Sequence, residues 1–229
     1  MQIKKRILPL KNFLRKLEGI LLSPFHSRLR LFWQAFKTRR KMDRQFGRRL
    51  DPFNYEHSEY ERLRFNALLE TIKRLNFEKV LEAGCAEGHF TARLVHCAKE
   101  VTALDISPVA LERVQKRAPE AHFIKADLLR WKPPLKERYD LIVLSDVLYY
   151  LERPLVQLEF ESLFGRIASW LTETGHIILA DGFGDDPTFH SRKMFRTRFE
   201  AAGLKLVSER IVPENTTHGL HCLVSVFGK

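Results

Sequence analysis

The sequence predicts an α/β protein with a doubly wound, seven-stranded, mostly parallel sheet and a basic helical arm in front of it. Two observations carry this prediction. From residue 60 onward, short apolar segments alternate with amphipathic helical segments, as in sheets that are covered by helices on both faces. The last two apolar segments, 203–212 and 219–229, are joined by a short link without a helix, which predicts an antiparallel pair at one edge.

The first half of the predicted domain follows the chain in order. Residues 60–75, YERLRFNALLETIKRL, have apolar side chains at helical spacing. A strand at 79–83 runs into a glycine turn, and a helix is expected from 90 to 98. Residues 100–107, EVTALDIS, form the second strand. Pro108 occupies the first turn of the next helix, with Ser107 as its cap.

The second half continues the alternation. AHFIKADLL at 121–129 supplies the third strand, and YDLIVLSDVLYYL at 139–151 supplies the fourth. A long helix is expected over 154–172, a fifth strand over 175–182 and a helix over 188–202. The two closing strands complete a sheet of seven.

Composition limits the class of protein. The chain has 229 residues, enough for one α/β domain and an appendage. Its three cysteines show no metal spacing and no CxxC, so we expect a reduced, cytoplasmic protein without a metal site. We expect no secretory signal, because no apolar core with a cleavage site follows the basic N-terminus. No uncharged apolar run is long enough to span a membrane.

The net charge of +11 lies in the arm, residues 1–50, which holds 15 Lys or Arg against two acids. Residues 51–229 hold 24 basic and 26 acidic residues, which makes nucleic acid an unfavoured partner. The arm contains two apolar-basic helical patterns, separated by SPF at 23–25. One interpretation is a helical lid or a solvated arm. The other is a peripheral contact with an anionic membrane.

The turn after the first strand, KVLEAGCAEGHF at 79–90, is the expected ligand site, since such sheets bind ligands at the carboxyl ends of their strands. The dinucleotide fingerprint G-x-G-x-x-G starting at Gly84 needs glycine at positions that hold Ala86 and His89. No Gly-Lys-Ser/Thr follows, which excludes a P-loop. A diphosphate would also be repelled by Glu82 and Glu87, in or beside the turn.

Two acids downstream complete an adenosine site. Asp105 ends the second strand 23 residues after Glu82, where an acid accepts hydrogen bonds from ribose hydroxyls. Asp127 and Leu128 end the third strand, placed to meet the adenine edge and face. The sequence therefore predicts adenosine without phosphate, and S-adenosylmethionine fits that description.

These segments resemble the successive motifs of class I S-adenosylmethionine-dependent methyltransferases, a Rossmann-like family. The resemblance is carried by VLEAGCAEGHF, VTALDIS, ADLL and LIVLSDVLYYL and covers about 51–229. DPFNYEHSEYERLRF and SDVLYYL are similar to the nodulation N-methyltransferase (NodS-like) family, whose members methylate an amine of an oligosaccharide. That family usually has Glu after the fourth-strand serine, where this chain has Asp146.

The resemblance assigns roles position by position. The methionine and ribose side of the cofactor is assigned to Gly84, Cys85, Ala86 and Gly88. Glu82 supports the turn or reaches the cofactor's amino group, and Asp105 takes the ribose hydroxyls. The adenine is assigned to Ile106, Asp127 and Leu128. The methionine moiety is assigned to Leu144, Ser145 and Asp146.

Candidates for catalysis are Tyr149 at the mouth of the site, Asp146 and His57. Asp146 has a structural alternative as a cap of the following turn. Tyr149 and Tyr150 are adjacent, so we expect only one of them to face the site. His57 lies with Phe53, Tyr55 and Tyr60 in a segment that is either a lid or a helix packed on the sheet.

The predicted function is methyl transfer from S-adenosylmethionine to an acceptor. An amine is favoured because no obligatory base is evident, and the resemblance to the NodS-like family implies that this amine belongs to a sugar or saccharide. An O-methyltransferase acting on a sugar, lipid or small molecule stays open, as does a non-catalytic cofactor-binding scaffold. The acceptor itself is not identified by these residues, because loops that choose substrates vary while the sheet stays the same.

Overall fold

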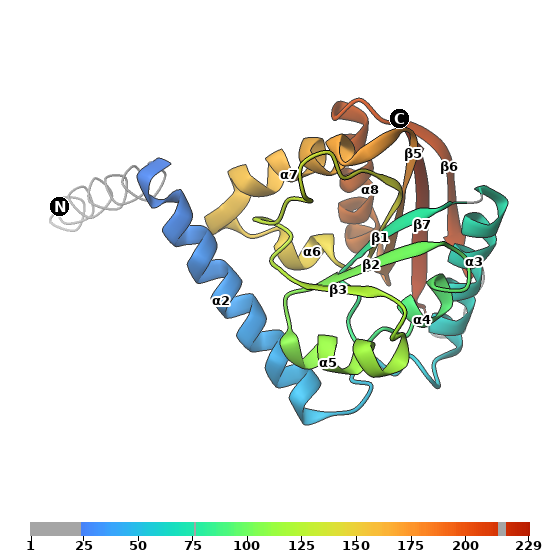
Figure 1. Cartoon of the computed structure of the whole chain (residues 1–229). Coiled ribbons are helices and arrows are strands. Elements are labelled where there is room, and N and C mark those ends of the chain that lie inside the picture. Colours follow the sequence, from blue (N-terminus) through green and yellow to red (C-terminus); the bar gives the residue numbers. More distant parts are fainter. Residues whose placement is uncertain (1–23, 76, 215–218) are drawn as a thin grey trace, which may run out of the picture.

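Seven strands form one central sheet in the order β3-β2-β1-β4-β5-β7-β6 (Figure 1). The computed structural model describes residues 24–75, 77–214 and 219–229. Strands β1 to β5 run parallel, and β7 is antiparallel to both β5 and β6. The strands are β1 (Lys79–Ala83), β2 (Glu100–Asp105), β3 (His122–Lys125), β4 (Tyr139–Ser145), β5 (Leu171–Phe183), β6 (Lys205–Val212) and β7 (His221–Gly228). The predicted fold class is thus confirmed.

The third and fourth strands end earlier than expected, at Lys125 and Ser145, and helix α6 takes up the last residues of the segment expected as the fourth strand. Two of the expected helices are also shorter. The helices are α2 (Pro24–Arg48), α3 (Glu59–Leu75), α4 (Thr91–Leu94), α5 (Pro108–Arg117), α6 (Leu148–Leu151), the 3₁₀ helix η1 (Pro154–Val156), α7 (Gln157–Ser169) and α8 (Asp186–Ala201). The helix expected over 90–98 is shorter, because the N–H groups of His96 and Cys97 bond to carbonyls only three residues back. The helix expected over 154–172 ends at Ser169, and Leu171 already pairs with Tyr139 in the sheet.

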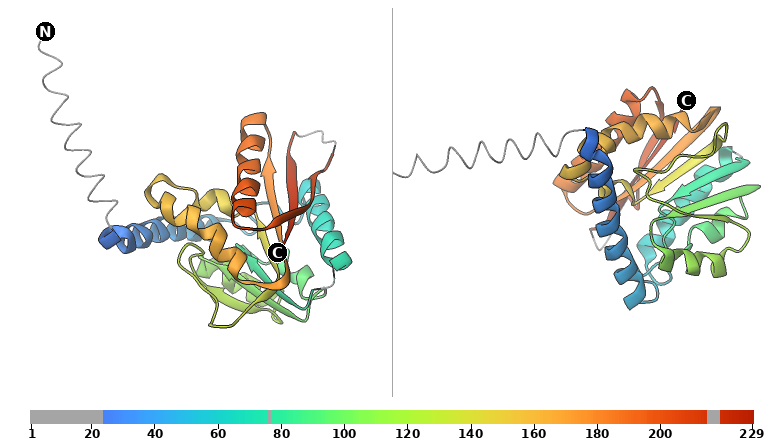
Figure 2. Two further views of the ribbon diagram at one scale, coloured as in Figure 1. Left: turned by 90° about the horizontal axis from the view of Figure 1, so that it is seen from above. Right: turned by 60° about the vertical axis from the view of Figure 1, so that its left-hand side comes forward.

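Alternate residues of the buried strands point to opposite faces of the sheet. One face packs on α3 and α4 and the other on α7 and α8 (Figure 2). The first cluster takes Phe65, Leu68, Ile72 and Leu94 from its helices. The second takes Phe160, Phe164, Phe195 and Phe199. Helices therefore cover both faces of the sheet.

The chain leaves β1 toward β2 on one side and later returns to β4 on the other, so the strand order reverses between β1 and β4. Ligands of open α/β sheets bind at such a reversal, beyond the carboxyl ends of the strands. Ser107 caps α5 as expected, accepting a hydrogen bond from the N–H of Ala110. The cap fixes the chain just beyond Asp105 at this edge.

Helix α2 crosses this edge from η1 to α5 (Figure 2). It starts at Pro24, where SPF was expected to break the pattern; the other predicted arm helix, around 13–21, lies outside the described residues. Arg30 is buried and pairs with Glu159, while Met42 and Phe46 are buried against the domain. The boundary at residue 50 between arm and domain stays a prediction, but the second half of α2 packs closely on the domain.

Candidate functional site

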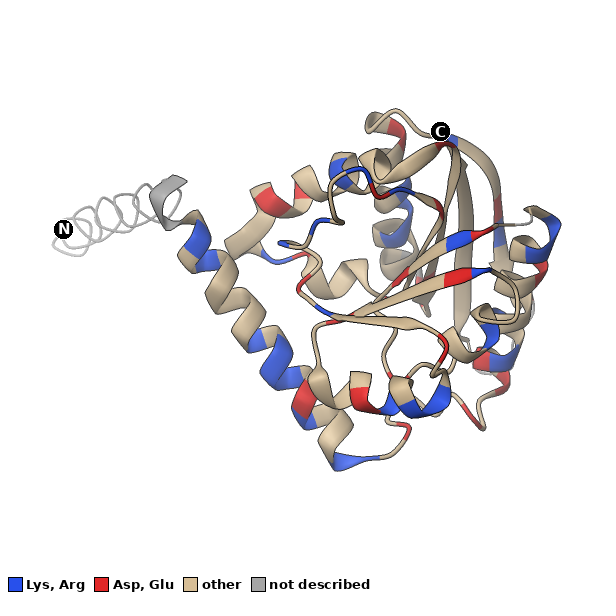
Figure 3. Ribbon diagram, in the orientation of Figure 1, with Lys and Arg blue, Asp and Glu red and all other residues tan. Residues whose placement is uncertain are grey.

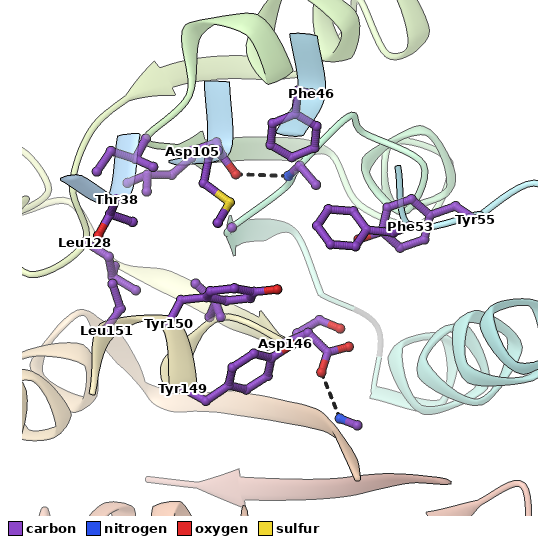
Figure 4. Close-up of a pocket in the computed structure, with 18 of the residues that line it drawn as sticks. Thr38, Phe46, Phe53, Tyr55, Asp105, Leu128, Asp146, Tyr149, Tyr150 and Leu151 are labelled. Carbon is purple, nitrogen blue, oxygen red and sulfur yellow. Dashed lines mark hydrogen bonds between the residues drawn. The ribbon is translucent and has the colours of Figure 1, made fainter. Parts of the chain in front are cut away.

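A cavity of about 300 Å³ opens at the carboxyl ends of β1, β2 and β4 (Figure 4). It is lined by Thr38, Met42, Phe46, Phe53, Tyr55, Tyr60, Glu61, Gly84, Ala86, Leu104, Asp105, Ile106, Ala126, Asp127, Leu128, Ser145, Asp146, Val147, Tyr149, Tyr150, Leu151, Gly182 and Leu220. The structure therefore gathers nine of the fourteen site residues that the sequence predicted. Its outer wall comes from α2 and from the segment before α3.

The glycine turn forms the floor of the cavity. Gly84 has φ +81°, and a Cβ there would lie 2.8 Å from Cγ2 of Val147. Ala86 lines the cavity at φ +48°, in the left-handed region that side chains seldom adopt. Gly88, with φ +79°, does not line the cavity; a Cβ there would lie 2.9 Å from Cγ1 of Val114 in α5. Both glycines thus permit close packing within the protein, Gly84 with Val147 after β4 and Gly88 with α5.

Asp105 joins the turn to the start of α5. Its Oδ2 accepts a hydrogen bond from the N–H of Ala86 (3.1 Å), and its Oδ1 accepts one from the N–H of Ser107 (2.8 Å). Burial raises the pKa of this carboxyl to about 6, against the lowering effect of the backbone donors. Near neutral pH the group is an ionised acceptor at the cavity wall, next to Ile106, and suits the hydroxyls of a ribose.

Asp127 and Leu128 form the wall beyond β3. Oδ1 of Asp127 accepts a hydrogen bond from the N–H of Leu129 (3.1 Å). Its Oδ2 is buried and has no hydrogen-bond partner in the described part of the chain. Burial raises the pKa of this carboxyl. A buried acceptor without a partner is costly, so this oxygen fits a donor that a ligand brings, such as an exocyclic amino group.

Arg64 of α3 holds the opposite wall. This buried side chain donates hydrogen bonds to Oγ of Ser145, to Oδ2 of Asp146 (2.7 Å) and to Oε2 of Glu61. The other oxygen of Asp146, Oδ1, accepts from the N–H of Gly182 (2.8 Å). Asp146 also has φ +52°. Both carboxylate oxygens of Asp146 thus link the end of β4 to α3 and β5, which favours a structural role for this residue. Its catalytic role stays a prediction.

Sequence reasoning missed Glu61 and Arg64. Both are buried on α3, and Glu61 lines the cavity. Burial raises the pKa of Glu61, in opposition to its Arg64 neighbour. The sequence did offer one indication of their role. The two charged residues are three apart on the apolar face of the helix predicted over 60–75. Thr38, Met42 and Phe46 were also missed, because only packing shows which face of α2 meets the cavity.

Glu82, Cys85 and Leu144 do not line the main cavity. Leu144 is fully buried in the sheet. Cys85 and Glu82 border a small adjoining cavity beneath the turn. Oε2 of Glu82 accepts a hydrogen bond from the hydroxyl of Thr91 (2.6 Å), so Glu82 supports the turn, one of its two predicted roles. Burial raises the pKa of Glu82 to about 8.

Glu82 predicts a pH dependence of stability. Because its pKa is higher in the folded state than its ordinary value of 4.5, the native protein binds more protons than the unfolded chain between these two pH values. The free energy of unfolding should therefore fall as the pH rises from about 4.5 to about 8. Urea titrations of the wild type and of Glu82→Gln should show a shallower fall in the variant. Equal slopes would contradict the burial of an ionisable group here.

Aromatic side chains surround the rest of the cavity. Both Tyr149 and Tyr150 line it, with ring centroids 4.6 Å apart, so the expectation that only one would face the site is wrong. The two residues belong to the single turn α6 and border a cavity wide enough to meet both (Figure 4). The guanidinium of Arg192 lies 4.1 Å from the ring of Tyr149. Burial raises the pKa of Tyr149 most, and the nearby carboxylate of Asp146 raises it further, so the hydroxyl stays protonated.

His57 is not brought to the cavity. It is exposed and lines a separate surface groove with Arg62, His89 and Arg93. A turn in which the N–H of Ser58 donates to the carbonyl of Asn54 directs this side chain outward. Tyr55 and Tyr60, on either side of it in the sequence, line the cavity. The structure therefore gives no support to its predicted catalytic role, and a lid role for the segment rests on Phe53 and the two tyrosines.

One cluster among the described residues has the geometry of a metal site. Possible ligand atoms of Asp51, Glu87 and His89 lie within 4.8 Å of one another. However, Arg113 donates a hydrogen bond to Oε1 of Glu87, and Arg117 donates one to its carbonyl oxygen. Burial lowers the pKa of His89 most, and the nearby guanidinium of Arg117 lowers it further. Two guanidinium groups oppose a further cation, so we assign no metal here.

Comparisons with known proteins show the family of this chain. The family model described as Nodulation protein S (NodS) matches residues 38–182. Nodulation protein S of Sinorhizobium fredii is 30% identical over 132 residues, which are 56% of this chain and 59% of that relative. The protein of the same name from Bradyrhizobium diazoefficiens is 34% identical over 105 residues, 44% of this chain and 49% of its own length. The matches thus cover about half of these curated relatives.

A solved structure extends the likeness over most of the chain. It is that of N-methyltransferase NodS from Bradyrhizobium japonicum WM9 in complex with S-adenosyl-L-homocysteine. The two chains are 26% identical with a TM-score of 0.70, covering 84% of this chain and 98% of the other. Magnesium protoporphyrin IX methyltransferase from Synechocystis PCC 6803, at 16% identity and a TM-score of 0.64, shares the fold.

Proposed function

The chain belongs to the Nodulation protein S family, and from this we propose that it transfers the methyl group of S-adenosylmethionine to an amine of a small acceptor. The fold is that of methyltransferases that use this cofactor, whose sulfonium supplies an already activated methyl group. What the protein must add is a dry, shaped cavity that aligns the amine with the methyl group.

The cavity residues fit the cofactor. The turn at Gly84 and Ala86 lines the cavity and would lie beside the methionine and ribose of the cofactor. Asp105 offers a carboxylate fixed by two backbone donors, which suits the ribose hydroxyls. The unused Oδ2 of Asp127 suits the amino group of adenine. Met42 and Phe46 cover this end from α2 and exclude water.

The amine proposal rests on the side chains that line the end of the cavity away from Asp105 and Asp127. Tyr55, Tyr60 and Tyr149 provide aromatic faces, which attract a cationic amine or sulfonium. Glu61 adds a carboxyl whose Oε2 is held by Arg64 and whose Oε1 forms no hydrogen bond within the described residues. No histidine stands among the described residues of the cavity wall. An amine needs only to lose its proton before attack, whereas a hydroxyl needs a positioned base.

We propose an amine of a sugar or saccharide as the acceptor, because residues 38–182 match the NodS family, whose members methylate an amine of an oligosaccharide. A panel of amino sugars, free sugars and lipid extracts, incubated with methyl-labelled cofactor, tests this, with the product identified by mass spectrometry. Label on an amine nitrogen is the expected result. Label on oxygen would replace the proposal with O-methylation. Cofactor binding without any transfer would favour a scaffold.

We also propose that the arm, residues 1–50, contacts an anionic membrane surface, and that the protein acts in the cytoplasm, in part at that surface. Its charge supports this, with 15 basic residues and two acids. None of the helices in the described ranges combines the length and apolarity that a bilayer span requires. The contact that we propose is peripheral and works through attraction of cations and shallow insertion of apolar side chains.

A further inference from the structure

Helix α2 presents an apolar stripe to solvent. Leu29, Phe32, Trp33 and Phe36 recur at spacings of three and four, so they share one face of the helix. Leu29 is 64% exposed, Phe32 57% and Trp33 49%. The rings of Trp33 and Phe36 stack at 5.8 Å, and Nζ of Lys37 lies 5.2 Å from the Trp33 ring. The stripe thus lies beside a cationic side chain.

A groove of about 270 Å³ lies beside this stripe, between α2 and the ends of β2 and β3. Phe32 and Phe36 form its apolar wall, and Arg39, Lys125 and Arg130 bring three cations from two parts of the chain. Lys125 and Arg130 are exposed, and no described residue forms an ion pair or hydrogen bond with either side chain. Arg39 has only a distant partner, Asp43, at 3.9 Å.

The one acid in the groove wall is Asp127, which also lines the cofactor cavity. It accepts a hydrogen bond from the N–H of Leu129 and is partly buried. Three cations against one acid leave the groove positive. Lys and Arg also recur along α2 (Figure 3), and most of them are exposed. An anion with an apolar tail matches this combination better than a wholly polar anion does, because the stripe is left in water unless apolar groups cover it.

We propose that this groove binds the phosphate headgroup of an anionic phospholipid, with Leu29, Phe32, Trp33 and Phe36 inserted beside it. The inference rests on the membrane contact proposed above and gives it a site. It also places the lipid against the outer side of the cofactor cavity, since Ile106, Ala126 and Asp127 line both. A methyltransferase bound in this way would work on acceptors that reach it at a membrane surface.

Vesicle binding of the full-length chain tests the site. Partition onto vesicles of equal parts phosphatidylcholine and phosphatidylglycerol is compared with partition onto phosphatidylcholine alone. Each cation near an anionic leaflet contributes about 1 kcal/mol, so Lys125→Ala with Arg130→Ala should lower partition onto the anionic vesicles about 30-fold. The matched control, Lys73→Ala with Lys205→Ala, removes two exposed cations from α3 and β6 on the other side of the molecule. It should change partition by less than about threefold.

Trp33 reports insertion directly. Its fluorescence should shift to shorter wavelength on anionic vesicles, and the shift should vanish in Trp33→Phe, which leaves Trp131 and Trp170 as the background. If wild type binds anionic vesicles but Lys125→Ala with Arg130→Ala binds equally well, the groove is not the site, although the membrane contact stands. No preference for anionic vesicles would overturn both. If a single-stranded oligonucleotide displaces the protein from the vesicles and shifts the Trp33 fluorescence in the same way, the groove binds a polyanion and not a lipid.

Binding of S-adenosylhomocysteine without vesicles separates this result from the methyltransferase proposal. The Lys125 and Arg130 variant should bind it as the wild type does, since neither side chain lines the cofactor cavity. A wild type that fails to bind S-adenosylhomocysteine would refute the methyltransferase proposal while leaving the vesicle result intact.

Discussion

Asp105→Ala should lower the affinity for S-adenosylhomocysteine by at least about 100-fold. The substitution removes a charged acceptor at the ribose position, where two hydrogen bonds to a carboxylate are each worth about 1.5–3 kcal/mol. It also frees the N–H of Ala86, which loses its 3.1 Å bond to Oδ2 and no longer fixes the turn. Isothermal titration calorimetry of both proteins measures the change.

Asp140→Ala provides a matched control for this prediction. Asp140 also accepts a backbone hydrogen bond, from the N–H of Lys79 (3.0 Å), but at the start of β1, the opposite end of the sheet from the cavity. Its removal should leave the affinity within about threefold of the wild type, even if it lowers stability. Unchanged affinity in Asp105→Ala, with a native circular dichroism spectrum, would show that the ribose site is misassigned.

Arg64→Ala should lower the free energy of unfolding by about 3–5 kcal/mol, the usual cost of removing one partner from a buried ion pair. The guanidinium is only 2% exposed and holds Glu61 and Asp146, whose side chains are 11% and 23% exposed. Without it, two carboxylates face each other at the cavity with no cation between them. Urea unfolding, monitored by circular dichroism, gives the difference.

The same helix offers the control. Glu59 and Arg62 form a second pair at spacing three, but their side chains are 74% and 62% exposed. Arg62→Ala should change the free energy of unfolding by no more than about 0.5 kcal/mol, because exposed pairs are screened by solvent. Similar losses in Arg62→Ala and Arg64→Ala would show that Arg64 is not the anchor of this wall.

The parts of the fold that depend on local pattern were predictable. The strands at 79–83 and 100–105 and the turn at Gly84 follow from apolar runs and a backbone that requires glycine. Asp105 and Asp127 could be placed at the cavity because the carboxyl ends of parallel strands share one edge of the sheet. Sequence order and strand ends therefore sufficed for the adenosine half of the site.

The acceptor half depends on tertiary packing, which local pattern does not determine. Nothing in the spacing of α2 distinguishes Met42, which meets the cavity, from Trp33, which meets solvent. Arg64 could be placed on a helix, but its three acceptors come from α3 and from the end of β4. His57 lies outside the cavity because several hydrogen bonds, including those that Asp51 accepts, shape the turn before it, and local pattern does not reveal them.

Calorimetric titration of the wild-type protein with S-adenosylhomocysteine and, separately, with NAD tests the central claim most directly. A cavity with Asp105 for the ribose, a free oxygen on Asp127 for the adenine and two glutamates near the turn should bind the first ligand one to one. NAD should give no binding heat, because the turn offers its diphosphate no site. Binding of NAD with no binding of S-adenosylhomocysteine would contradict the assignment of this site.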